Sequence, residues 1–182
     1  MKKVFIFLAD GFEEIEAIAP IDILRRAGID VVTVSISENN VVTGAHGIKV
    51  EADQLFIETD FSSNDMLVLP GGGVGTENLT AHTRMNELLE NQNNSGKQIA
   101  AICAAPSVLG KLGILAGKEA ICYPGFEEKL TGAVISKNTV VKDGNIITGK
   151  GPGVAIPFAL KIVETLKGKE TASQVADSLM LN

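Results

Sequence analysis

The chain has 182 residues and a formal net charge of -6, with 45% hydrophobic and 21% charged residues. This length and balance predict a single globular domain over residues 1–182 and exclude a mostly disordered chain. The acidic charge argues against a nucleic-acid partner, because no basic stripe is present to meet phosphates.

No stretch of the chain predicts a targeting or membrane segment. The apolar run near the N-terminus ends at Asp10 without a small-residue cleavage site, so it indicates a strand and not a signal peptide. No apolar run approaches the length that spans a membrane. Two cysteines do not make a disulfide framework, and a cytoplasmic location without membrane contact is therefore expected.

Apolar runs alternate with turn residues along the first half of the chain, and this pattern predicts strands that alternate with helices. In chain order, the predicted elements are a strand at 3–8, a turn at 10–11, a helix at 12–27 ended by Gly28, a strand at 29–36, an edge hairpin at 41–50, a strand at 65–69, a flexible glycine loop at 70–73 and a helix near 85–92. The strands at 3–8 and 65–69 are strongly apolar, as buried strands are.

The second half continues the alternation. Its predicted elements are a strand at 98–102, a helix that starts near Pro106, strands at 120–122, 134–135, 139–142 and 146–148, turns at 123–125 and 143–144, and helices at 154–166 and 170–180. Strands alternating with helices predict an α/β fold with a mostly parallel sheet wrapped on both faces. In such a fold, reactive groups gather outside the carboxyl ends of the strands.

Cys103 follows the buried strand at 98–102 and precedes a helix, with no room for a true loop. A cysteine at such a junction sits on a sharp turn, much like a nucleophile elbow. The free N–H groups at the helix start favour the thiolate, so we expect a lowered pKa. The alternative is that Cys103 is a small buried apolar residue, which the local pattern leaves about as probable.

Two other segments supply candidates for the same site. Glu16 on the first helix would have a raised pKa if its carboxyl turned inward beside a thiol, although a surface glutamate is favoured by the helix alone. The N–H groups of Gly72, Gly73 and Ala104 could form an oxyanion site, or the glycine loop could be only a turn. Clustered Cys and His ligands are missing, so no metal is expected.

Four motifs occur in order along the chain: A-D-G-F-E-E-I-E-A, V-L-P-G-G, A-A-I-C-A-A-P and G-K-G-P-G. Together they resemble the ThiJ/PfpI family, in particular the branch of the parkinsonism-associated protein deglycase and its bacterial relatives. The resemblance implies a flavodoxin-like three-layer α/β sandwich, usually a homodimer. It also implies that Cys103 is the reactive cysteine, that Glu16 hydrogen-bonds it, and that Gly72, Gly73 and Ala104 are the oxyanion donors.

The chain departs from the family pattern at two positions. Tyr123 stands where many relatives have a histidine near the cysteine, and Ala104 stands where protease-like members have one. A cysteine–histidine dyad is therefore missing, and peptide hydrolysis is not expected. His46 stands where relatives can carry an arginine that reaches the partner's pocket. We therefore take His46 as a candidate pocket residue, together with Tyr123 and Arg26.

The resemblance implies a cofactor-independent enzyme that acts on reactive α-oxoaldehydes, either free or as adducts on amines and thiols. The alternative function is a non-catalytic redox sensor or chaperone-like protein that uses oxidation of the same cysteine. A homodimer is also expected, because the helix at 12–27 is apolar on two sides. The pattern places Ile15, Ile18, Ile21 and Leu24 on a face distinct from the one with Phe12, Ala19 and Ile23.

Overall fold

The structure, a computed structural model, describes residues 1–181. One seven-stranded sheet with the order β10-β11-β7-β6-β1-β2-β5 forms its centre. Neighbouring strands in this sheet run parallel, except that β10 and β11 pair antiparallel. In sheet order these strands span Val140–Asp143, Ile146–Gly149, Gln98–Ile102, Met66–Leu69, Lys3–Leu8, Asp30–Ser35 and Gln54–Leu55.

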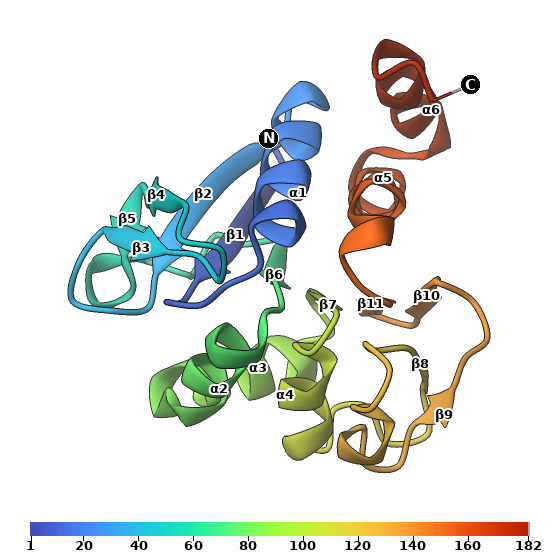
Figure 1. Cartoon of the computed structure of the whole chain (residues 1–182). Coiled ribbons are helices and arrows are strands. Elements are labelled where there is room, and N and C mark those ends of the chain that lie inside the picture. Colours follow the sequence, from blue (N-terminus) through green and yellow to red (C-terminus); the bar gives the residue numbers. More distant parts are fainter. Residues whose placement is uncertain (182) are drawn as a thin grey trace.

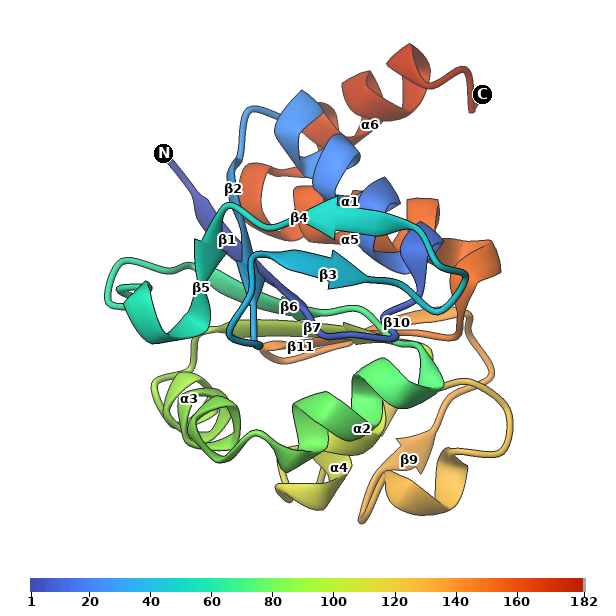
Figure 2. The ribbon, with the colours of Figure 1, turned by 60° about the vertical axis from the view of Figure 1, so that its left-hand side comes forward.

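Helices cover both faces of the sheet and complete a three-layer sandwich (Figures 1 and 2). One face carries α1, α5 and α6, and the other carries α2, α3 and α4. These helices span, from α1 to α6, Glu14–Arg26, Gly73–Ala81, Thr83–Asn94, Pro106–Lys111, Ala155–Lys167 and Lys169–Ser178, and short 3-10 helices η1, η2 and η3 span Phe56–Glu58, Glu127–Lys129 and Pro152–Val154. Among residues 1–181, no helix has the length and apolarity needed to cross a membrane.

The central strand β1 shows why both faces must be covered. Val4, Ile6 and Leu8 pack into the hydrophobic cluster under α1 and α5. Phe5 and Phe7 belong to the cluster on the other face. Because successive side chains of a strand point to opposite faces, a strand that is apolar at every position needs a layer on each side. The predicted α/β fold with a mostly parallel sheet is confirmed.

The predicted strands are all present, with ends within two residues of those expected. The edge hairpin is also confirmed, as β3 (Val41–Thr43) paired with β4 (Lys49–Glu51), while β8 (Glu119–Ala120) pairs with β9 (Val134–Ile135). The sequence did not predict β5 or α2. The α2 segment G-V-G-T-E-N-L-T-A holds two glycines, which disfavour helix, so its propensity gave no signal.

The expected division of α1 into two apolar faces is partly wrong. Ile21 and Leu24, which were assigned to the outer face, are 8% and 0% exposed and belong to the core. Ile15 and Ile18 are 56% and 42% exposed. The helix therefore buries one stripe against the sheet and α5 and leaves two isoleucines near its N-terminal end in solvent.

The carboxyl ends of β1, β6 and β7 meet at one edge of the sheet, because these neighbouring strands run parallel. Three segments leave that edge: the turn before α1, the glycine loop before α2 and the cysteine turn before α4. These are the segments that the sequence singles out for chemistry.

Candidate active site

Cys103 lies directly after β7 with a φ of 65°, in a left-handed conformation that non-glycine residues seldom adopt. Its N–H donates to the Gly149 carbonyl at 2.9 Å, and its carbonyl accepts the N–H of Tyr123 at 2.8 Å. These bonds hold the strained turn from both sides. Helix α4 begins at Pro106, as predicted. The cysteine is 8% exposed at the edge of the sheet.

Glu16 is fully buried in the first turn of α1, so the local preference for a surface glutamate is wrong. The carboxylate of Glu13 caps the helix and accepts the N–H of Glu16 at 2.9 Å. Glu16 Oε2 in turn accepts the N–H of Gly71 at 2.9 Å. Its other oxygen, Oε1, has no hydrogen bond of normal geometry among residues 1–181. The Glu16 carboxyl also interacts with the Cys103 thiol, and the interaction affects the pKa of both groups.

Glu16 and Cys103 form a coupled pair. Burial raises the pKa of Glu16 to about 7, although hydrogen bonds from Cys103 and Gly71 oppose the rise. Burial also raises the pKa of Cys103 to about 12, and the negative charge of Glu16 adds to the rise. Two adjacent buried anions repel each other, so above a pH of about 7 the pair keeps one proton. Glu16 is therefore a base suited to neutral pH, placed beside a thiol.

The prediction that the N–H groups at the helix start lower the pKa of Cys103 below its ordinary value is wrong. Burial and the Glu16 carboxylate outweigh the N–H groups of Gly72 and Ala104, which hydrogen-bond the sulfur and lower its pKa. The balance changes when Glu16 carries the proton, because its charge no longer opposes a thiolate. The thiolate is therefore favoured when the proton moves to Glu16.

Gly72 and Ala104, two of the three expected oxyanion donors, direct their N–H groups to the Cys103 sulfur. Gly72 has a φ of 91°, and a Cβ there would collide with the Gly11 carbonyl, so only glycine fits. Gly73 is the exposed first residue of α2, and within residues 1–181 its N–H does not bond the sulfur.

The other candidate pocket residues lie in different places. The N–H of Tyr123 bonds the cysteine turn, and the tyrosine ring is half-exposed. The ring packs against Gly151, where an added Cβ would lie only 3.2 Å from Cδ2 of Tyr123. Arg26 does not reach the pocket of its own chain. It occupies the last turn of α1 and pairs with Asp22 at 2.6 Å, roughly 15 Å along the helix from Glu16.

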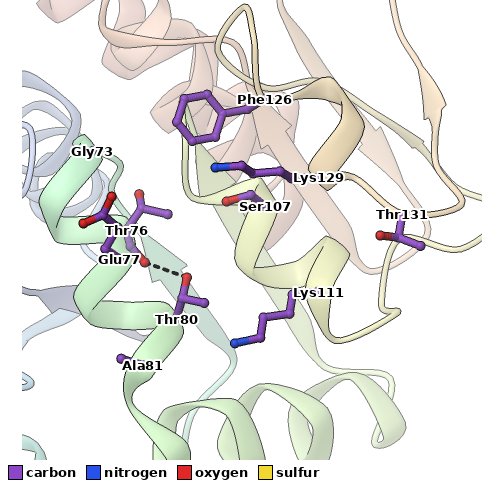
Figure 3. A pocket seen from close by; sticks show the side chains of 10 residues that line it. All are labelled: Gly73, Thr76, Glu77, Thr80, Ala81, Ser107, Lys111, Phe126, Lys129 and Thr131. Carbon is purple, nitrogen blue, oxygen red and sulfur yellow. Dashed lines mark hydrogen bonds between the residues drawn. The ribbon is translucent and has the colours of Figure 1, made fainter.

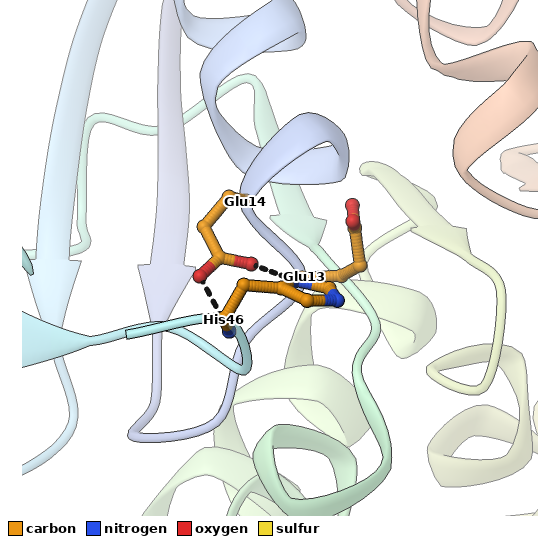
Figure 4. Close-up of side chains that lie close together, drawn as sticks. All are labelled: Glu13, Glu14 and His46. Carbon is orange, nitrogen blue, oxygen red and sulfur yellow. Dashed lines mark hydrogen bonds and ion pairs between the residues drawn. The ribbon is translucent and has the colours of Figure 1, made fainter. Parts of the chain in front are cut away.

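His46 contacts Glu14, the first residue of α1 (Figure 4). Glu14 is 5% exposed, and its carboxylate accepts the backbone N–H of His46 at 2.7 Å. The imidazole Nδ1 lies 2.7 Å from Glu14 Oε2, and this hydrogen bond raises the pKa of His46. Burial works to raise the pKa of Glu14, but the bonds from His46 and Ile48 outweigh it and lower the pKa.

Glu13, Glu14 and His46 also bring ligand atoms within 4.8 Å of one another, as a metal ion would require. The structure gives these atoms other partners. Both Glu14 oxygens bond His46, and Glu13 accepts the N–H of Glu16. The cluster therefore ties the β3–β4 hairpin to the start of α1, and we assign it that structural role.

The raised pKa of Glu16 predicts that this carboxylate destabilises the fold. The folded state holds the proton up to a pH of about 7, whereas the unfolded carboxyl releases it near 4.5, so the free energy of unfolding falls as pH rises between these values. Glu16→Gln should remove the penalty and stabilise the protein by about 1–3 kcal/mol above neutral pH. Thermal unfolding of both proteins at about pH 5 and pH 8 tests this. A variant that melts below the wild type at the higher pH would contradict it.

Known proteins resemble this chain over nearly its whole length. The model of the DJ-1/PfpI family matches residues 2–165. Protein dj-1beta of Drosophila melanogaster is 40% identical over 99% of this chain and 97% of its own length. A Caenorhabditis elegans protein named glutathione-independent glyoxalase DJR-1.2 is 37% identical over the same shares of both chains. The solved structure of oxidized Toxoplasma gondii DJ-1 superimposes with a TM-score of 0.95 at 37% identity and covers 99% of this chain and 98% of that chain.

Proposed function

The chain belongs to the DJ-1/PfpI family, and we propose that it is a cysteine-dependent enzyme that converts α-oxoaldehydes to hydroxy acids without a cofactor. The observation that carries this proposal is the buried pair itself. Glu16, with a pKa of about 7, lies beside a thiol whose sulfur receives two backbone N–H groups. A relative named as a glyoxalase supports the substrate class.

The first step joins the Cys103 sulfur to the aldehyde carbon of methylglyoxal while Glu16 accepts the thiol proton. The aldehyde oxygen becomes an oxyanion, which the N–H groups of Gly72 and Ala104 can stabilise; Gly73 is the third donor that we propose. Glu16 Oε1, which lacks a hydrogen bond of normal geometry within residues 1–181, is free to take part in these proton transfers.

Glu16 then gives the thiol proton to the oxyanion, which leaves a hemithioacetal and an ionised Glu16. In the second step Glu16 takes the proton from the former aldehyde carbon and gives it to the neighbouring carbonyl carbon, while the hydroxyl proton of the first carbon passes to the oxygen of the second. The first carbon is oxidised to a thioester and the second is reduced to an alcohol, so no external oxidant is needed. Water then cleaves the carbon–sulfur bond, which releases lactate and restores the thiol. Tyr123 would line the entrance, since it adjoins the cysteine turn and half of its side chain is exposed.

Proton NMR of methylglyoxal incubated with the protein tests this proposal. Consumption of the aldehyde should match the appearance of lactate, with no other product. If the aldehyde is consumed without lactate, and adducts on lysine or arginine account for it, the proposed reaction is wrong.

A second candidate is a redox sensor, favoured by the same donors. Oxidation of Cys103 to a sulfinate would place its oxygens near the N–H groups of Gly72 and Ala104, with a protonated Glu16 as a further donor. A relative with a similar structure is described as oxidized. Loss of aldehyde turnover in step with Cys103 oxidation would connect the two roles.

We also propose that the chain forms a homodimer through the exposed N-terminal end of α1. Ile15 and Ile18 on α1 are exposed together with Ile48, whose N–H approaches Glu14 at 3.4 Å. Apolar side chains grouped on one face are typical of subunit contacts. Such a dimer would also allow His46 to approach the partner's Cys103, which stays a prediction.

Light scattering should therefore give twice the chain mass of 19.1 kDa at micromolar concentration. The double variant Ile15→Asp/Ile18→Asp should shift the mass to that of one chain. As a control, Val134→Asp changes an exposed apolar residue of β9, on the far side of the molecule from α1 (Figure 1), and should leave the dimer intact. A wild-type mass near 19.1 kDa would refute the dimer.

A further inference from the structure

A pocket of about 540 Å³ lies between α2 and the α4–η2 segment, beside the cysteine turn (Figure 3). It reaches from Gly73 at the start of α2 to Ser107, one helical turn after Cys103. Its volume lies in the range that holds a small organic molecule. It is larger than a three-carbon aldehyde needs, and of its lining residues the proposed chemistry at Cys103 uses only Gly73.

Two lysines give the pocket a cationic side. Lys111 and Lys129 both line it, and Figure 3 shows their ammonium groups extending towards α2. Lys129 lies over the Phe126 ring at 4.5 Å from its centroid, which holds it at the pocket wall. Neither lysine has an ion-pair partner among residues 1–181. Two unpaired cations lining one pocket of an acidic chain are suited to an anion.

Both sides of the pocket, α2 with Thr80 and Glu77 and α4 with Ser107, offer groups that accept hydrogen bonds. The hydroxyls of Thr80 and Ser107 donate inward to the carbonyls of Thr76 and Ala104, each at 2.7 Å, so towards a ligand their oxygens can only accept. Glu77 adds a carboxylate, which also accepts. A ligand that bonds these groups must bring its own hydroxyl donors.

Thr76 adds a buried polar group to the wall formed by α2. It lines the pocket, is 4% exposed, and its buried hydroxyl has no hydrogen-bond partner in the described part of the chain. Buried hydroxyls are nearly always bonded in folded proteins, to protein, to water or to a ligand.

We propose that this pocket binds a sugar-sized molecule that carries both an anionic group and several hydroxyls. The phosphate or carboxylate would lie between Lys111 and Lys129, and the hydroxyls would donate to Glu77, Thr80 and Ser107. Phosphate and carboxylate share the property that the lysines recognise, a localised negative charge. Binding in this pocket does not require the reaction at Cys103.

Calorimetric titration of the wild type and of Cys103→Ser tests the proposal with four probes: glucose 6-phosphate, gluconate, glucose and inorganic phosphate. At least one of the two anionic sugars should bind in both proteins, and the tighter one identifies the anionic group. Glucose and inorganic phosphate should each bind more weakly. Anionic sugars that bind no better than glucose would overturn the proposal, and equal affinity for inorganic phosphate would overturn the role of the hydroxyls.

Variants locate the binding in the pocket. Lys111→Gln and Lys129→Gln should each weaken binding of the tighter anionic sugar about tenfold, the usual effect of losing one charge-assisted hydrogen bond. Glu77→Gln removes a negative charge from the pocket wall and should therefore tighten binding of the same anionic sugar. The control Lys137→Gln removes the same charge as the two lysine variants from an exposed lysine that does not line the pocket. If Lys111→Gln and Lys129→Gln behave like this control, the pocket is not the site.

Discussion

Cys103→Ser should lower methylglyoxal turnover by at least ~1,000-fold, because a serine hydroxyl beside a base with a pKa of about 7 is a far weaker nucleophile than a thiol. The substitution changes one buried atom in a turn fixed by backbone bonds to Gly149 and Tyr123, so the fold should persist. Steady-state rates of lactate formation, with circular dichroism to verify folding, measure the effect.

The control for this variant is Cys122→Ser. Cys122 is 1% exposed in the core cluster on the α3–α4 face, and burial raises its pKa to about 11. The same chemical change there should leave turnover within about threefold of the wild type, once any loss of stability is allowed for. Equal losses in the two variants would mean that Cys103 is not specifically required.

Glu16→Gln should lower turnover at least ~100-fold, the usual size of general acid–base catalysis. The glutamine can still accept the N–H of Gly71, but it can neither take the thiol proton nor move a proton between the two substrate carbons. Glu13→Gln is the matched control, because it makes the same change in the residue that caps the helix. A Glu16→Gln variant that turns over at the wild-type rate would refute the proton-transfer role.

The pH dependence separates this role from a purely structural one. Glu16 acts as a base only when ionised, so wild-type kcat/KM should rise as pH increases through about 7 and then level off. In Glu16→Gln the inflection near 7 should disappear. Because this variant is expected to be more stable above neutral pH, a loss of activity cannot be attributed to unfolding.

Local signals predicted the parts of the site that depend on neighbouring residues. The apolar run at Gln98–Ile102 followed by Cys103 and Pro106 was sufficient to place the cysteine on a turn between strand and helix. The sequence left the glycine loop as either an oxyanion site or only a turn, and in the structure its Gly71 packs closely against Glu16 and Cys103. The order of strands and helices predicted the three-layer fold.

Features that depend on distant contacts could not be predicted in this way. Glu14 is buried because the β3–β4 hairpin folds back over α1 and supplies N–H donors from His46 and Ile48. The high pKa of Cys103 results from burial and from Glu16, which is remote in sequence. Helix α2 forms although two of its residues are glycines, and Gly75 allows its backbone to approach Phe12.

The central claim is that the pair of Cys103 and Glu16 turns over substrate and is regenerated. The most direct test counts the lactate molecules formed per chain and then measures the mass of the peptide that contains Cys103. Many lactate molecules per chain, with the peptide mass unchanged, are the predicted result. Product formation that stops at one equivalent, with an adduct or oxygen atoms on Cys103, would contradict the claim.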